Sequence, residues 1–166
     1  MTFVPEYRFD TFDMVSAEFL LSIGVKGIVL DIDNTLEPYE HPTPGDHVVR
    51  WLDGLHAAGI STAIVSNNGR ERVELFNKEL GMPAFYKSGK PFTGRIRAAM
   101  AAMGTDRTNT ALMGDQVFTD VWAAHNAGLT AILVPPINDK KDIFTRFKRL
   151  LERPVLKKYE RRGGGR

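Results

Sequence analysis

The sequence feature that most constrains this chain is the stretch from Gly27 to Leu36, which reads Gly-Ile-Val-Leu-Asp-Ile-Asp-Asn-Thr-Leu. Three consecutive apolar residues, then two aspartates and Asn-Thr, are typical of a buried strand that ends in a turn. A strand without polar alternation fits a parallel sheet that is covered on both faces. In such sheets ligands bind beyond the carboxyl ends of the strands, where Asp31 and Asp33 would lie. An ordinary acidic turn without a ligand fits this stretch equally well. The rest of the chain must decide between a binding site and such a turn.

Segments with strand and helix patterns alternate along the chain. Between the strands, apolar residues recur at helical spacing, and glycines or prolines separate the segments. This alternation is typical of an α/β fold with three layers, a Rossmann-like, mostly parallel sheet of five strands with helices on both faces. The predicted strands end at 31 or span 60–65, 82–86, 110–113 and 129–134, and the predicted helices span 46–58, 70–80, 93–103 and 117–126.

The residues before the first strand predict one more helix. Aromatic and aliphatic side chains recur there at roughly helical spacing, Ser16 or Asp13 could cap the helix, and Gly24 would end it. The apolar face of this predicted helix consists of Phe9, Phe12, Val15, Phe19, Leu20 and Ile23.

The composition excludes several kinds of site. A chain of 166 residues suits one domain with a single good core. It has no cysteine, which excludes a disulfide framework, a thiolate metal site and a cysteine nucleophile. No apolar run approaches the roughly 20 residues of a membrane span, and the acidic, aromatic N-terminus does not resemble a secretory signal. We therefore expect a cytoplasmic protein.

Charge divides the chain into two parts. Residues 139–166 hold 11 Lys or Arg and 4 Asp or Glu, a net charge of +7, whereas residues 1–138 carry a net charge of −5. We therefore predict a folded body over 1–138, which includes the leading helix, and a basic amphipathic helix with a flexible end over 139–166. A basic segment on an acidic body is typical of contact with something anionic.

Polar side chains follow four of the predicted strands at the points where those strands end. Because the carboxyl ends of parallel strands meet at one edge of a sheet, we expect these side chains to converge. Four such junctions at one edge are unlikely to arise by chance. The residues are Asp31 and Asp33 after the first strand, Ser66 and Asn67 after the second, Lys90 beyond the third, and Asp115 and Asp120 after the fourth.

The chemistry that fits this set is phosphoryl transfer through an aspartyl-phosphate. Three carboxylates, on Asp31, Asp33 and Asp115, would repel one another and a phosphate dianion. A hard divalent cation removes this repulsion, and oxygen ligands without a nearby His or Cys select Mg²⁺. We predict that Asp31 is both nucleophile and metal ligand, that Asp115 is a second ligand, and that Asp33 offers the metal its backbone carbonyl.

The other polar residues fit supporting roles. The Asp33 side chain would protonate the leaving oxygen and later deprotonate the attacking water. Lys90 would let nucleophile and phosphate approach each other, and Asp120 would orient Lys90 or support the metal ligands. Ser66 and the N–H groups beside it would hold a phosphoryl oxygen near a helix N-terminus. The further substrate-binding candidates are Asn67, Asn68 and Thr35, whose hydroxyl can also lock the turn after Asp33.

In this order the residues resemble the four motifs of the haloacid-dehalogenase (HAD) superfamily of phosphatases. The resemblance covers about Val25 to Val134 and is specific because all four motifs occur in order. A finer likeness to the small YqeG-type branch covers nearly the whole chain and extends to the mitochondrial phosphatidylglycerophosphate phosphatases. The superfamily motifs are Asp31-Ile32-Asp33-Asn34-Thr35, Ser66, Lys90-Pro91 and Gly114-Asp115-x4-Asp120, and the branch is indicated by Ile-Val-Ser-Asn-Asn, Tyr86-Lys87 and Gly-Asp-Gln-x-x-Thr-Asp.

The resemblance implies a Mg²⁺-dependent phosphomonoester hydrolase with the residue roles given above. It also suggests phosphatidylglycerophosphate as one possible substrate. Lys87 is a rival for the site lysine, although Lys90 with its following proline fits the motif better. Dehalogenase activity is disfavoured, because Asp33 is the acid that phosphatases need for an alkoxide leaving group.

The intervals between the motifs are too short for a cap domain. Only 34 residues separate Asp31 from Ser66, and 23 separate Ser66 from Lys90. A loop and one helix fill most of the first interval, and one helix and a short strand fill the second. An uncapped site suits a large or surface-bound phosphate, such as a lipid headgroup, a protein or a nucleic-acid end. Alternatively a neighbouring subunit covers the site, and the sequence leaves the oligomeric state open.

Two interpretations of the C-terminal helix follow from its pattern. Its apolar side could pack on the body, against the N-terminal aromatic helix, or it could bring the domain to an anionic membrane as an interfacial helix. Nucleic-acid binding is disfavoured because the stretch lacks an established motif. The apolar residues are Ile143, Phe144, Phe147, Leu150 and Leu151, with Lys and Arg between them.

Two other functions compete with catalysis. A phospho-accepting receiver module also uses acidic residues, Ser or Thr and Lys on an α/β sheet, but its phosphorylated aspartate would stand where this chain has Ser66-Asn67. A catalytically idle HAD-like module could bind a membrane, RNA or ribosomes, yet no member of the catalytic set is missing. The sequence therefore favours the phosphatase.

Overall fold

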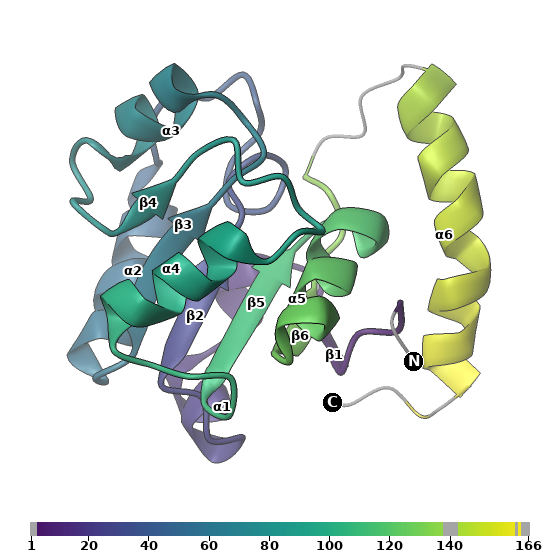
Figure 1. The fold of residues 1–166 in the computed structure, drawn as a ribbon, viewed down its shortest axis with the longest axis horizontal. Helices are drawn as coiled ribbons and strands as arrows, with labels where there is room; N and C mark the ends of the chain where they lie inside the picture. The colour runs from purple at the N-terminus through teal and green to yellow at the C-terminus, as the bar shows by residue number, and fades with distance from the viewer. Residues whose placement is uncertain (1–2, 138–142, 162, 164–166) are drawn as a thin grey trace.

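The computed structural model describes residues 3–137, 143–161 and 163, with the side chains of 143–149 left out. One sheet of six parallel strands crosses the molecule in the order β1-β6-β5-β2-β3-β4 (Figure 1). Strand β2 lies between β3 and β5, so Asp31, the residue after it, emerges from the middle of the carboxyl edge. The strands are β1 (Tyr7–Arg8), β2 (Gly27–Leu30), β3 (Ser61–Val65), β4 (Ala84–Phe85), β5 (Thr110–Gly114) and β6 (Thr130–Leu133).

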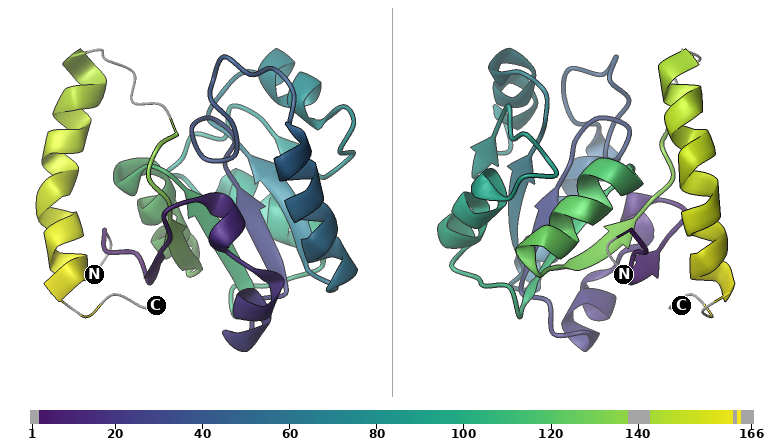
Figure 2. Two further views of the ribbon diagram at one scale, coloured as in Figure 1. Left: turned by 180° about the vertical axis from the view of Figure 1, so that it is seen from behind. Right: turned by 45° about the vertical axis from the view of Figure 1, so that its right-hand side comes forward.

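Helices cover both faces of the sheet, as Figure 2 shows. One face carries η1, α1, α2 and α3, and the other carries α4, η2 and α5. The predicted three-layer α/β fold is confirmed. The helical elements are the 3₁₀ helix η1 (Phe12–Met14), α1 (Ala17–Ser22), α2 (Asp46–Ala57), α3 (Arg70–Asn77), α4 (Gly94–Met103), the π-helix η2 (Val117–Val121), α5 (Trp122–Ala127) and α6 (Ile143–Arg161).

The continuous apolar character of β2 has a direct structural cause. Its alternate residues point to opposite faces, so Ile28 and Leu30 join the core under α2, whereas Val29 joins the core under α4. All four residues of the strand are buried. A strand that fills two cores at once has no position for a polar residue, and the first carboxylate can appear only where the strand ends.

The N-terminal segment differs from the predicted helix. Only Ala17–Ser22 is α-helical, with Ser16 as its cap, whose Oγ accepts a hydrogen bond from the Phe19 N–H at 3.1 Å. The preceding residues form η1 and the short strand β1, which adds a sixth strand to the five that we expected by pairing with β6. This pairing covers an edge of β6 that would otherwise be exposed. Aromatic and aliphatic side chains three to four residues apart therefore reach the core from a segment in which only Ala17–Ser22 is α-helical.

Helix α6 packs on the body through one side. The Glu152 carboxylate is buried and accepts a hydrogen bond from the Val117 N–H at 3.1 Å, and Tyr159 is buried on the same side. Leu150 and Leu151, two members of the predicted apolar side, are instead 54% and 48% exposed. Leu150 precedes Glu152 by two residues, which places it on nearly the opposite side of a helix. The side chains of Ile143, Phe144 and Phe147 lie outside the described residues, as do residues 162 and 164–166 of the end that was expected to be flexible.

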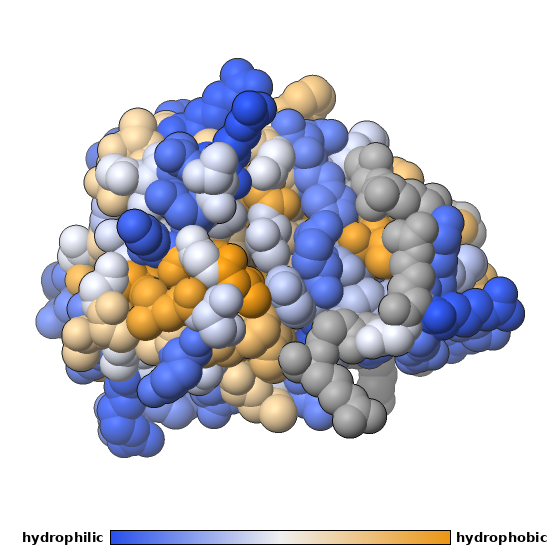
Figure 3. Space-filling model, turned by 90° about the horizontal axis from the view of Figure 1, so that it is seen from below, coloured by the Kyte–Doolittle hydropathy of each residue, from blue (hydrophilic) through white to orange (hydrophobic). Residues whose placement is uncertain are grey.

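The carboxyl ends of the strands lie toward the top of Figure 1, and α1 lies at the opposite end. Figure 3 views the molecule from that opposite end and shows an apolar area beside polar surface. Leu21 of α1 is 48% exposed. None of the helices in the described part of the chain is both long and apolar enough to cross a membrane.

Candidate active site

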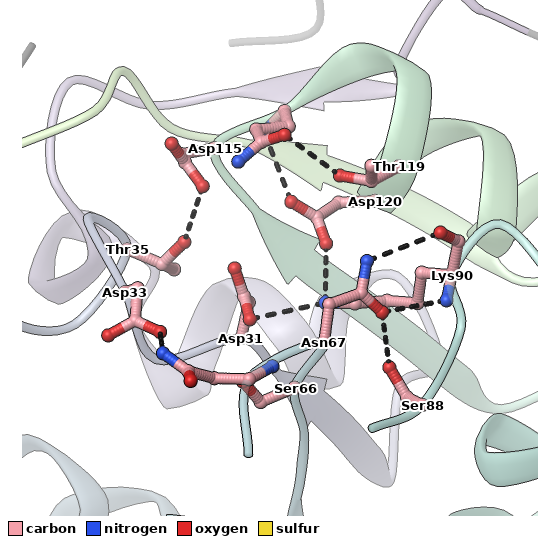
Figure 4. A network of polar contacts seen from close by, with 12 residues as sticks. Asp31, Asp33, Thr35, Ser66, Asn67, Ser88, Lys90, Asp115, Thr119 and Asp120 are labelled. Carbon is pink, nitrogen blue, oxygen red and sulfur yellow. Dashed lines mark hydrogen bonds and ion pairs between the residues drawn. The ribbon is translucent and has the colours of Figure 1, made fainter. Parts of the chain in front are cut away.

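The centre of the site is a buried lysine between two aspartates (Figure 4). The Lys90 Nζ lies 2.6 Å from Asp120 Oδ1 and 3.2 Å from Asp31 Oδ1. The side chains of Lys90 and Asp120 are 2% and 1% exposed, and that of Asp31 is 11% exposed. Asp31 follows β2, Lys90 precedes α4 and Asp120 belongs to η2, so these ion pairs join three separate connections at one point. The structure brings Lys90 to the carboxylates, whereas the rival Lys87 is exposed.

A π-helix and a glycine place Asp120 at this point. The N–H groups of Asp120 and Val121 both bond to the Gln116 carbonyl, in the widened turn of η2. Asp120 Oδ2 also accepts a hydrogen bond from the Gln116 N–H at 3.1 Å. The carboxyl group packs so closely on Gly114 that any Cβ atom at this position would overlap it. Gly114 of the fourth motif is therefore required by packing.

Asp115 completes a group of acidic residues that fits a divalent cation. One carboxylate oxygen from each of Asp31, Asp115 and Asp120 lies within 4.8 Å of the others, and all three residues are buried. Thr35 Oγ1 donates to Asp115 Oδ1 at 3.3 Å. Three buried carboxylates beside a single ammonium leave an excess of negative charge that a cation would neutralise, and oxygen ligands suit a hard ion. Both oxygens of Asp120 contact other groups of the protein, Oδ1 the Lys90 ammonium and Oδ2 the Gln116 N–H.

The burial of the site changes the pKa of both partners of the ion pair. Desolvation is the largest effect on Asp31 and raises its pKa to about 7, against the Lys90 charge, with Asp120 and Asp33 adding to the rise. Desolvation acts to lower the pKa of Lys90, but the charges of Asp120 and Asp31 outweigh it and raise that pKa above its usual value. Lys90 is therefore charged at neutral pH, while Asp31 takes up or loses a proton near it.

Asn67 ties the end of β3 to the lysine loop. Its Oδ1 accepts hydrogen bonds from the Lys90 N–H and from Ser88 Oγ, both at 2.7 Å, and its Nδ2 donates to the Lys90 carbonyl at 3.2 Å. Both ends of the amide are thus engaged with the loop. The geometry gives Asn67 a positioning role for Lys90 in addition to the substrate contact that we predicted.

Ser66 and Asn68 form the turn into α3. Ser66 is buried, and its Oγ accepts a hydrogen bond from the Asn68 N–H at 3.1 Å. The Asn68 side chain is used twice, because its Oδ1 accepts from the Gly69 N–H at 2.7 Å and its Nδ2 donates to Asp33 Oδ2 at 3.0 Å. The predicted phosphate-binding turn therefore also holds the predicted acid.

Asp33 has a second partner that sequence reasoning missed. Arg72 of α3 contacts Asp33 Oδ1 through Nε at 3.1 Å and Nη2 at 3.0 Å. Figure 4 shows the Asp33 carboxylate on the side of the site away from Lys90 and Asp120. The sequence offered only a weak signal: Arg72 is a basic residue in the first turn of the helix that follows Ser66-Asn67-Asn68, close to the strand ends.

Glu37 is the other residue that the motifs did not single out. It is buried, its Oε1 accepts a hydrogen bond from the Gly45 N–H at 2.7 Å, and its Oε2 lies 2.9 Å from His41 Nδ1. Glu37 thereby closes the loop between Asp33 and α2. This loop supplies the His41 carbonyl to which Arg72 Nη1 donates at 2.6 Å. One buried glutamate thus helps to orient the partner of Asp33.

Comparisons with known proteins identify the family to which this chain belongs. A family model described as HAD-hydrolase-like matches residues 87–142, which contain Lys90, Asp115 and Asp120. The chain is 34% identical to the "Probable phosphatase YqeG" of Bacillus subtilis over 161 residues, which is 97% of this chain and 94% of that protein. It belongs to the YqeG-type branch of the HAD superfamily of phosphatases.

Solved structures agree on the fold. A putative HAD superfamily (subfamily III A) hydrolase from Legionella pneumophila matches with a TM-score of 0.53 at 21% identity, over 72% of this chain and 70% of that one. The cobalt-bound deoxy-D-mannose-octulosonate 8-phosphate phosphatase YrbI of Haemophilus influenzae matches with a TM-score of 0.53 at 14% identity, over 80% and 90%. Within the described residues, the connections around the site contain loop and single helices and no cap domain, as the motif spacing predicts.

Replacement of Gly114 by alanine should disrupt the site. The new Cβ would displace the Asp120 carboxyl group and separate it from Lys90, so we expect a loss of stability of about 2 kcal/mol or more. Thermal unfolding by circular dichroism measures this change. Gly54→Ala is the control, because Gly54 lies inside α2 with open space around it and alanine favours a helix. Equal stability of both variants would contradict the packing argument.

The affinity for a divalent cation should rise with pH. A raised pKa means that Asp31 is protonated below about pH 7 and must lose this proton to bind a cation. With Mg²⁺ as the probe, we expect the apparent affinity to increase about tenfold per pH unit below pH 7 and to level off above it. The Mg²⁺-induced shift of the unfolding midpoint, titrated at each pH, measures it. An affinity that does not change with pH would refute this prediction.

Proposed function

We propose that this chain hydrolyses phosphomonoesters with Mg²⁺, through an aspartyl-phosphate on Asp31. One observation carries the proposal: the buried Asp31 carboxylate lies beside both the Lys90 ammonium and Asp115 at the carboxyl edge of the sheet. A nucleophile in this position has a fixed cation next to it and a second carboxylate with which to share a metal ion. Membership of a phosphatase family supports the same chemistry.

In the first half-reaction an Asp31 oxygen attacks phosphorus. A bond forms between this oxygen and phosphorus, the bond from phosphorus to the ester oxygen breaks, and the ester oxygen leaves as an alcohol with a proton from Asp33. Lys90 holds Asp31 in place and offsets charge as the phosphate approaches. Bound Mg²⁺, held by Asp31, Asp115 and the Asp33 backbone carbonyl, would screen the repulsion between carboxylate and phosphate.

In the second half-reaction water attacks the aspartyl-phosphate. Asp33, now ionised, takes a proton from this water, the bond between phosphorus and Asp31 breaks, and inorganic phosphate leaves. Ser66 and the N–H groups at the start of α3 would bind phosphoryl oxygens in both steps, with Thr35 holding Asp115 in orientation. The net reaction consumes one phosphomonoester and one water, and yields one alcohol and one phosphate.

For the substrate we propose a phosphate that is presented at a surface, with phosphatidylglycerophosphate as the first compound to test. The absence of a cap over the site within the described residues supports a substrate too large to be enclosed. The likeness to YqeG supports a phosphatase but names no substrate. Phosphate release from the lipid in vesicles is the direct measurement.

We also propose that α6 contacts anionic membrane. The helix is held on the body by Glu152 and Tyr159, while Leu150 and Leu151 are exposed. Exposed leucines beside basic residues are typical of an interfacial helix. Such a helix buries its apolar side chains in the membrane, and its cations are attracted to anionic headgroups. The exposed basic residues of the described part of α6 are Arg153, Lys157, Lys158 and Arg161.

Replacement of Asp31 by asparagine tests the nucleophile. The amide cannot form the covalent intermediate, so we expect Mg²⁺-dependent hydrolysis of p-nitrophenyl phosphate to fall by at least about 10³-fold. Asp53→Asn, an equal change at an exposed position in α2, should leave the rate unchanged. Equal rates in both variants would remove Asp31 as nucleophile. A folded wild type that hydrolyses no member of a broad phosphate panel would favour the binding module instead.

The double variant Leu150→Gln, Leu151→Gln tests the membrane contact. Both side chains are half exposed, so the exchange should leave the fold intact and reduce binding to vesicles rich in anionic lipid by about tenfold or more. Co-sedimentation with vesicles measures binding, and hydrolysis of p-nitrophenyl phosphate should stay unchanged. Leu75→Gln, at a leucine of α3 that is 44% exposed, is the matched control. Equal vesicle binding of both variants would contradict a lipid-facing α6.

A further inference from the structure

Arg72 is held in place by groups other than Asp33. Its Nη1 donates to the His41 carbonyl at 2.6 Å, and its guanidinium lies over the rings of Phe76 and Tyr39, at 5.4 and 5.8 Å from their centroids. Phe76 belongs to the same helix, and the loop closed by Glu37 carries the other two groups. The guanidinium would therefore keep its position if Asp33 turned away.

The edge of Arg72 that faces Asp33 is shaped to bind an anion. Nε and Nη2 both point to one oxygen of Asp33, at 3.1 and 3.0 Å, and this pair of donors matches a carboxylate or a phosphate. The Arg72 side chain is 11% exposed and that of Asp33 is 21% exposed. The anion partner is thus the more accessible member of the pair, and another anion could replace it from the solvent side.

In the observed arrangement Asp33 is not free to act on a leaving group. One oxygen is bound by Arg72 and the other by Asn68 at 3.0 Å, on the side of the site away from Lys90 (Figure 4). To reach the ester oxygen, Asp33 must give up at least one of these contacts. If it leaves Arg72, a largely buried guanidinium edge loses its counter-charge, which is unfavourable unless another anion takes its place.

We propose that Arg72 is a substrate-binding residue for an anion in the leaving group. The proposal rests on the phosphatase function stated above and specifies its substrate class: phosphomonoesters whose alcohol part carries a carboxylate or a phosphodiester close to the ester oxygen. Such an anion binds Nε and Nη2 of Arg72 in place of Asp33, and Asp33 is released toward the ester oxygen beside it. A substrate with a neutral leaving group has no anion to replace Asp33 on Arg72. It is therefore bound more weakly and hydrolysed more slowly.

The primary test is binding of unreactive phosphonates by titration calorimetry with Mg²⁺ present. 3-Phosphonopropionate and propylphosphonate differ only in a terminal carboxylate in place of a methyl group. We expect the wild type to bind the carboxylate compound at least tenfold more tightly. Arg72→Gln should reduce this ratio to near one, and Arg72→Lys, which keeps the charge but not the paired donors, should restore part of it.

Arg70→Gln is the matched control. Arg70 starts the same helix but is exposed, pairs with Glu74 at 2.7 Å and lies over the Tyr86 ring, away from Asp33. This variant should keep the wild-type ratio. A wild type without preference for the carboxylate, or an Arg72→Gln variant that keeps the preference, overturns the proposal.

Turnover then separates this proposal from the proposed function. 3-Phosphoglycerate and glycerol 3-phosphate form a matched reactive pair, and glycerophosphoglycerol phosphate adds the phosphodiester arm. We expect Arg72→Gln to lower at least tenfold the ratio of kcat/KM for 3-phosphoglycerate to kcat/KM for glycerol 3-phosphate, and to lower in the same way the ratio for glycerophosphoglycerol phosphate. An equal loss for all three would assign Arg72 a purely structural role and refute the proposal. A phosphonate preference without hydrolysis of any ester would instead refute the phosphatase function and leave the anion subsite standing.

Discussion

The ion pairs of Lys90 hold the site together. A lysine ammonium with 2% of its side chain exposed cannot remain charged without close anions, and here Asp120 and Asp31 supply them at 2.6 and 3.2 Å. These three residues come from the connections that follow β2, β4 and β5, so the requirement to compensate one buried charge fixes three loops relative to one another. Asn67 adds a fourth connection, since its amide binds the Lys90 backbone from the end of β3.

The four aspartates of the site form two electrostatic units. Asp31 and Asp120 share the Lys90 ammonium, and Asp115 lies close to both carboxylates, a grouping that suits a divalent cation. Asp33 stands apart, with its own cation in Arg72 and a neutral donor in Asn68. This division explains how two carboxylates only two residues apart can perform different chemistry. Asp31 is held beside Lys90, whereas Asp33 is held by Arg72 and Asn68.

Backbone geometry makes this arrangement possible in a small domain. Asn34 adopts a left-handed conformation with φ of 61°, which turns the chain between Asp33 and Thr35 and which few residue types other than glycine and asparagine tolerate. The π-helix after Asp115 returns Asp120 to the sheet within one widened turn, against a glycine that leaves room for it. These devices need few residues.

The sequence by itself determined the elements whose pattern is local. The apolar run of β2 and the helical periodicities predicted the α/β fold, and the motif residues at the strand ends predicted which side chains meet, because parallel strands place their carboxyl ends at one edge. The tertiary structure alone decided the roles of residues whose partners are distant in the chain. Arg72 contacts Asp33, which is 39 residues away in the sequence, and Glu152 accepts a hydrogen bond from Val117, which is 35 residues away. The pairing of β1 with β6 and the side of α6 that faces the body are decided in the same way, since packing against another segment selects one arrangement among several that the local pattern allows equally.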